Sequence, residues 1–252
     1  MHKDALEGKQ KQMQGQAMAS YRTIHVKQNQ YSGKEMLKQL GIQPGPPVII
    51  FMGGAAKMNT EDATRLERAI HDGVARAAVE LETIVVDGGT DSGTMGLLNA
   101  ALRTRNYHGI YIGIAPGSLT HLPNQPSGSL EPLGDAHTHF VLVEGENWGD
   151  ELEPMYALVN ALAEEAPSIG ILVNGGKGTE NELEENVDDD RKVMVLDGSG
   201  RLADKISLQL RYPGTIGGDN IEKMSKDGNF TVFDIDLDPD KLAKKIKDYL
   251  RS

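Results

Sequence analysis

The sequence of 252 residues contains no cysteine and no long hydrophobic run. Without cysteine there is no disulfide framework, no thiolate metal site and no cysteine nucleophile, and this fits a reducing cytosol. The longest apolar runs, such as residues 48–52 and 169–173, are far too short to span a bilayer. The N-terminus also lacks the apolar core of a signal peptide. We therefore expect a cytoplasmic protein that makes no use of a membrane.

Basic side chains are also in short supply. The 26 Lys and Arg residues are outnumbered by 37 Asp and Glu, which gives a net charge of −11. Nucleic-acid backbones require a concentrated basic surface, so DNA and RNA are not expected as partners. A small anionic ligand remains possible because backbone N–H groups can hold it with little help from Lys or Arg.

Glycine is abundant, with 29 residues, many of them clustered at the ends of apolar runs. From residue 48 onward a pattern recurs about six times: a buried apolar run, a Gly-rich turn and an amphipathic helix. This pattern predicts an α/β fold, an open Rossmann-like, mostly parallel sheet with helices on both faces. A TIM barrel would need eight such units. Strands are expected at 23–26, 48–52, 83–86, 109–114, 139–143, 169–173, 192–196 and 230–235, and helices at 32–40, 60–80, 94–104, 150–164, 179–187, 201–210 and 239–250.

We expect one main domain over residues 47–252. Residues 1–46 are expected to form a polar N-terminal arm, frayed or helical over 1–20, and then a short strand and helix. Residues 117–137 are rich in Pro and Gly and predict a long loop, either a lid or a surface excursion.

Right-handed crossovers place the Gly-rich turns at the carboxyl edge of a parallel sheet, where such folds bind ligands. The first turn after a long buried strand contains Gly53 and Gly54. The second follows Asp87 and opens a helix, so hydroxyls, N–H groups and the helix dipole can meet a phosphate there. A tight turn with an N-cap explains this second loop about as well. Its candidate residues are Gly88, Gly89, Thr90, Asp91, Ser92, Gly93 and Thr94.

A third loop repeats the design at Gly175, Gly176, Lys177, Gly178 and Thr179. It matches neither a Walker A loop nor the GxGxxG fingerprint. Glu182 lies three residues after Thr179, which suits either a capping-box carboxylate or a catalytic or ribose-binding role.

A fourth loop contains Asp197, Gly198, Ser199 and Arg201. Asp197 is placed to bind a ribose hydroxyl and Arg201 a phosphate. Several Gly-rich loops on one edge favour a binding cleft over independent turns.

Two further features are weaker. His137 and His139 share a strand face, but no third ligand is spaced to join them, so we predict a capping or ligand-contacting role and no metal. Trp148 is the only tryptophan, and it is a candidate for stacking on a base.

Taken in order, these segments resemble the SLOG superfamily, and within it the LSDAT branch. That branch occurs in the N-terminal cytosolic region of TRPM cation channels and in stand-alone prokaryotic proteins. The resemblance covers roughly residues 47–210. The segments that carry it are Gly-Gly-Thr-Asp-Ser-Gly at 88–93, Gly-Ile-Ala-Pro at 113–116, His-Thr-His-Phe-Val-Leu-Val at 137–143, Asn-Gly-Gly-Lys-Gly-Thr at 174–179 and Val-Leu-Asp-Gly-Ser-Gly-Arg at 195–201.

This resemblance implies a domain that senses nucleotides or nucleotide-derived ligands such as ADP-ribose or NAD-related molecules, with no cofactor required. It adds Ala115 and Pro116 to the candidate ligand contacts. It also implies that a signal passes to an effector protein or through self-association, so a homo-oligomer is expected.

The same superfamily includes the LOG phosphoribohydrolases, which use an Arg and the Glu of a PGGxGTxxE loop. Here Asn174 replaces the Pro and Glu182 takes the Glu position, while Arg103 and Arg201 are candidates for the Arg. The alternative function is therefore a nucleotide N-glycosidase. A structural role with an empty cleft is a third hypothesis.

Overall fold

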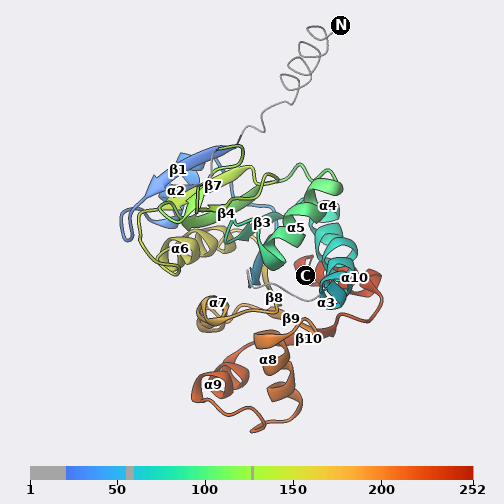
Figure 1. Ribbon diagram of the computed structural model, residues 1–252. Helices are drawn as coiled ribbons and strands as arrows, with labels where there is room; N and C mark the ends of the chain where they lie inside the picture. The colour runs from blue at the N-terminus through green and yellow to red at the C-terminus, as the bar shows by residue number, and fades with distance from the viewer. Residues whose placement is uncertain (1–20, 55–59, 126–127, 252) are drawn as a thin grey trace, which may run out of the picture.

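The computed structural model describes residues 21–54, 60–125 and 128–251. Eight strands form one sheet in which all neighbours are parallel, in the order β1-β7-β4-β3-β2-β8-β9-β10 (Figure 1). The predicted open, parallel α/β fold is therefore confirmed. The strands are β1 (Arg22–Val26), β2 (Val48–Gly53), β3 (Ile84–Asp87), β4 (Tyr111–Pro116), β7 (His139–Val143), β8 (Ser168–Val173), β9 (Val193–Asp197) and β10 (Phe230–Asp234).

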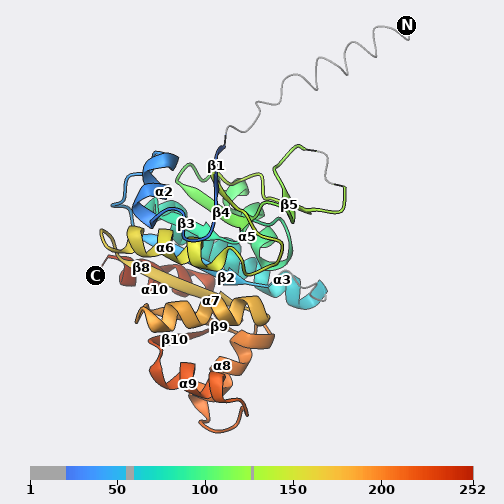
Figure 2. The same ribbon diagram turned by 90° about the vertical axis from the view of Figure 1, so that its left-hand side faces the viewer.

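Helices cover both faces of this sheet (Figures 1 and 2). Alternate residues of β2 enter opposite cores: Val48, Ile50 and Met52 pack on one face, Ile49 and Phe51 on the other. The first face is covered by α2 (Gly33–Leu40), α6 (Leu152–Ala163), α7 (Lys177–Asp188), α8 (Arg201–Arg211) and α9 (Asp219–Asp227). The second is covered by α3 (Thr60–Ala69), η1 (Ile70–Ala75), α4 (Arg76–Leu81), α5 (Gly93–Thr104) and α10 (Pro239–Leu250). Within the described ranges, no helix has the length and apolar character needed to cross a membrane.

The segment before residue 47 is part of the same sheet from β1 onward. β1 pairs with β7 from Arg22 opposite His139 to Val26 opposite Val143, and α2 packs against α6. The predicted division at residue 46 therefore does not separate β1 and α2 from the sheet. The predicted arm over 1–20 lies outside the described residues.

Three local features differ from the sequence-based expectation. The expected helix over 60–80 contains the π-helical turn η1, in which Gly73 lies against Leu242 of α10. Helix α9 was not expected. The expected loop over 117–137 contains two short paired strands, β5 (Thr120–His121) and β6 (Glu131–Pro132).

Candidate functional site

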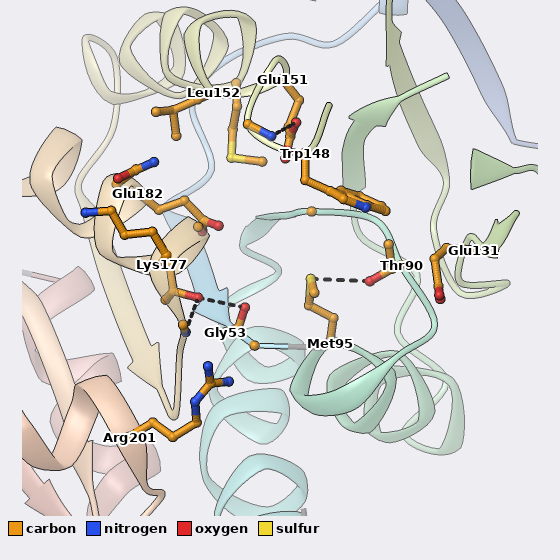
Figure 3. Close-up of a pocket in the computed structure, with 18 residues that line it drawn as sticks. Gly53, Thr90, Met95, Glu131, Trp148, Glu151, Leu152, Lys177, Glu182 and Arg201 are labelled. Carbon is orange, nitrogen blue, oxygen red and sulfur yellow. Dashed lines mark hydrogen bonds between the residues drawn. The ribbon is translucent and has the colours of Figure 1, made fainter. Parts of the chain in front are cut away.

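The strand order reverses between β2 and β8, the fifth and sixth of the eight strands in the sheet. From β2 the chain proceeds to its neighbour β3, whereas from β8 it proceeds to β9 on the other side. Parallel sheets bind ligands in the crevice at such a switch point. A pocket of about 480 Å³ lies there and is drawn in Figure 3. Its lining includes the predicted residues Gly53, Gly54, Gly88, Thr90, Gly176, Lys177, Gly178, Thr179, Glu182 and Arg201.

The first turn of α7 forms one side of this pocket. The backbone N–H groups of Lys177, Gly178 and Thr179 have no hydrogen-bond acceptor among the described residues, as is usual for a helix N-terminus. Space is open above Gly178, where an added Cβ would meet no heavy atom within 4 Å. The turn thus offers donors and the positive end of the helix dipole to a ligand.

The Thr179 side chain serves the fold rather than the pocket. Its hydroxyl donates to the Gly53 carbonyl oxygen at 3.1 Å and accepts from the Gly176 N–H at 3.3 Å. It therefore fixes the start of α7 to the end of β2, which sets the position of the free N–H groups. The capping role considered for Glu182 is taken by Thr179.

Arg201 reaches the pocket from the start of α8. A Cβ on Gly54 would lie 3.3 Å from its Nη1, and one on Gly176 would lie 2.7 Å from its Nη2. Both glycines thus make room for the guanidinium. The Arg201 side chain has no hydrogen bond or ion pair with any described residue. A guanidinium at the pocket wall that pairs with none of the described residues is suited to an anionic ligand.

Polar groups of the loop before α8 form hydrogen bonds with the loop after β8. The N–H of Ala203 donates to the Asn174 carbonyl at 2.9 Å, and the Asn174 side chain donates to the Ser199 carbonyl at 2.8 Å. Asp204 accepts from the Gly198 and Gly200 N–H groups at 2.8 and 3.0 Å. The N-terminus of α8 is thereby satisfied within the protein.

The Asp197 carboxylate forms an ion pair with Arg211 and so is already engaged within the protein. Asp197, Gly198, Ser199 and Gly175 are not among the residues that line the pocket. Of the fourth predicted loop, only Arg201 reaches it.

The loop from β3 to α5 contributes Gly88 and Thr90 to the pocket. Its other polar groups are engaged elsewhere: Thr94 donates its N–H to the Gly54 carbonyl at 3.2 Å, and Ser92 donates to Glu131 at 2.9 Å. Five other residues of this loop were predicted to contact a ligand but do not line the pocket: Gly89, Asp91, Ser92, Gly93 and Thr94.

Beneath this loop lies a buried polar cluster. The Asp87 carboxylate accepts from the Gly89 N–H at 2.7 Å and lies 2.9 Å from Nε2 of His137. Nδ1 of His137 lies 3.0 Å from the Gly134 carbonyl, and Tyr111 donates to the other Asp87 oxygen at 2.5 Å. Both imidazole nitrogens therefore face oxygen atoms, one of Asp87 and one of the Gly134 carbonyl. His137 thus holds the ligand-side loop in place and does not line the pocket.

Three carboxyl groups line the pocket, those of Glu131, Glu151 and Glu182. Burial, reinforced by the charges of Glu151 and Asp87, raises the pKa of Glu182 to about 8. Burial also raises the pKa of Glu151, which accepts the Gly149 N–H at 2.8 Å. The Glu182 carboxyl has no hydrogen-bond or ion-pair partner among the described residues. It is therefore a protonated acid at neutral pH that faces the ligand space.

The remaining predicted residues lie outside the pocket lining. Arg103 of α5 pairs with Asp135 at 2.8 Å and is largely exposed. Ala115 and Pro116 are buried at the end of β4, where the Pro116 carbonyl accepts from Thr120 at 2.9 Å. Of the two arginines considered for phosphate binding, the pocket contains Arg201.

The family profile described as "SLOG in TRPM, prokaryote" matches residues 46–244 of the chain. The chain belongs to this family. Among curated proteins it is similar to the transient receptor potential cation channels of subfamily M. Member 1 of Mus musculus is 24% identical over 66% of the chain, member 2 of Mus musculus is 23% identical over 67%, and the trpm channel of Drosophila melanogaster is 26% identical over 66%. The chain spans only 12%, 14% and 10% of the length of these relatives, respectively.

In this SLOG domain, several lining residues come from segments that carry no glycine signature for a ligand. Trp148, Gly149, Glu151, Leu152 and Met155 lie at the start of α6. Glu131 belongs to the segment around β6, which docks on the β3–α5 loop through the bridge from Thr90 to Leu133. The lining is completed by Met95 and Asn181. Only Trp148 had a sequence signal, as the single tryptophan.

Proposed function

We propose that this SLOG domain is a binding module for a small phosphate-bearing ligand of the nucleotide type, such as ADP-ribose or an NAD-related molecule. The observation that carries the proposal is the first turn of α7, where three N–H groups line a pocket beside Arg201, and neither these groups nor the Arg201 side chain has a partner among the described residues. Helix N-termini of this kind are common phosphate sites.

The charges around the site support an anionic group at this end. Lys177 is exposed and pairs only with Glu180, at 3.2 Å, among the described residues, so it can swing toward a phosphate. The three carboxyl groups favour hydroxyl or amino donors on the remainder of the ligand. A ribose and a base satisfy that requirement. We further propose that the domain acts in the cytosol and passes its state to an effector protein or to a second copy of itself.

Thermal shift with AMP, ADP-ribose, cyclic ADP-ribose and NAD tests the proposal. At least one of these ligands is expected to raise the melting temperature at millimolar concentration. If none does, the proposal fails.

Gly178→Leu provides the sharper test, because an added Cβ at Gly178 would meet no heavy atom within 4 Å and the rest of the side chain would occupy ligand space. The variant is expected to match or exceed the wild-type melting temperature without ligand, since glycine disfavours helix, and to lose the ligand-induced shift. Gly217→Leu is the matched control: Gly217 also has open space and lies outside the pocket lining. An unchanged ligand shift in Gly178→Leu would contradict the phosphate position.

A second candidate function, hydrolysis of a nucleotide N-glycosidic bond, is favoured by Glu182. A carboxyl with a pKa of about 8 is protonated at neutral pH and can give its proton to the departing base as the C–N bond breaks. Water then forms the new C–O bond at the ribose and returns a proton to the Glu182 carboxylate. Arg201 would hold the phosphate. Release of free base that disappears in Glu182→Gln would establish this function, whereas a thermal shift without base release supports the binding module.

A further inference from the structure

Trp148 presents a large aromatic surface to the pocket. It is the only tryptophan of the chain, it lines the pocket, and it is 53% exposed. Apolar surface left in contact with water inside a concave site is often part of an interaction surface. The ring is therefore available for contact with a ligand in the pocket.

The loop that carries Trp148 is held by hydrogen bonds on both sides of the residue. One carboxylate oxygen of Asp150 accepts from the N–H groups of Glu146 and Asn147, at 2.9 and 3.0 Å. The Asp150 carbonyl in turn accepts from the Gln28 side chain at 2.8 Å. The backbone that carries the ring is thus ordered before any ligand binds, which reduces the entropic cost of binding.

The pocket has two chemically different sides (Figure 3). Trp148 and Met95 lie on the side away from α7, next to Thr90 and Glu131. Leu152 and Met155 contribute further apolar surface from the start of α6. The opposite side holds Lys177 and the free N–H groups. A ligand that fills both must have a flat apolar end and an anionic end.

Building on the proposed function, we propose that Trp148 is the stacking platform for the aromatic base of a ligand whose phosphate binds at the first turn of α7. Aromatic side chains stack on any of the nucleic-acid bases, because every base has a π-face. Trp148 therefore selects compounds that join a planar aromatic base to a phosphate over sugar phosphates that have no base.

The test compares AMP with ribose 5-phosphate, which share the phosphate and the ribose and differ in the base. Affinities are measured by calorimetry for the wild type, Trp148→Phe and Trp148→Ala, and tryptophan emission is followed in the wild type. Because Trp148 is the sole tryptophan, any emission change reports on this ring. Tyr212→Ala is the control, since Tyr212 is 62% exposed and is not a lining residue of the pocket.

We expect AMP to change the emission and to bind about 5- to 150-fold more weakly to Trp148→Ala, with most of the affinity kept in Trp148→Phe. Ribose 5-phosphate is expected to bind all variants alike and to leave the emission unchanged. Equal losses for both compounds, or no loss for AMP, would overturn the stacking role while leaving phosphate binding intact. If neither compound binds the wild type, the proposed function fails together with this inference.

Discussion

Replacement of Glu182 by glutamine should remove one contribution to the pH dependence of the free energy of unfolding. Burial raises the pKa of this carboxyl from its ordinary 4.5 to about 8 in the folded protein. Between these values the unfolded chain has lost the proton while the folded protein still binds it, so the stability of the wild type falls as the pH rises. The full shift corresponds to about 5 kcal/mol, as an upper bound, because the carboxyl retains some contact with water.

Urea unfolding of the wild type and Glu182→Gln at pH 5 and pH 9 measures this effect. The amide cannot ionise, so the free energy of unfolding of the variant, relative to the wild type, is expected to rise by about 2 to 4 kcal/mol between the two pH values. Glu180→Gln is a control of opposite sign on the same helix. Asn220 and Lys177 lower the pKa of Glu180, so this variant should lose stability at high pH and recover it under acid conditions. A Glu182→Gln difference that is the same at both pH values would refute the reasoning.

Three further predictions concern the site and its support. His137→Leu removes a buried hydrogen-bond partner of the Asp87 carboxylate, so urea unfolding should show a loss of about 1 to 3 kcal/mol in the free energy of unfolding; a loss below about 0.5 kcal/mol would argue against a structural role of this contact. Glycine at position 174 can adopt the left-handed backbone found there, φ 55°, but Asn174→Gly removes the hydrogen bond from the side chain to the Ser199 carbonyl. The free energy of unfolding is therefore expected to fall by about 1 to 2 kcal/mol in the same assay. Phosphate-ligand affinity should decrease above pH 8 as Glu182 ionises; calorimetry at pH 6.5 and 9 checks this, and persistence of the decrease in Glu182→Gln would assign it to another group.

The sheet and the position of the pocket were predictable, because apolar runs followed by Gly-rich turns place those turns at one edge. What the sequence does not reveal is which turns still have free donors. Asn174 and Asp204 satisfy the start of α8, although its Gly-Ser-Gly sequence looks as suitable for a phosphate as that before α7. Such competition depends on contacts between loops distant in sequence. Trp148 and Glu131 enter the pocket from segments whose approach is set by packing, so no local pattern indicates them.

The central position of β2 has a consequence for how the chain folds. β2 pairs with β3 on one side, but its other partner, β8, brings Ser168 opposite Val48. During synthesis from the N-terminus, one edge of β2 therefore stays open until most of the chain has emerged. Pairing across so long a separation is slow, and an open apolar edge strand invites aggregation. The strand beside the pocket thus pairs with β8 across a long stretch of chain. This long-range pairing is slow in the complete chain as well, so refolding yields should fall with protein concentration.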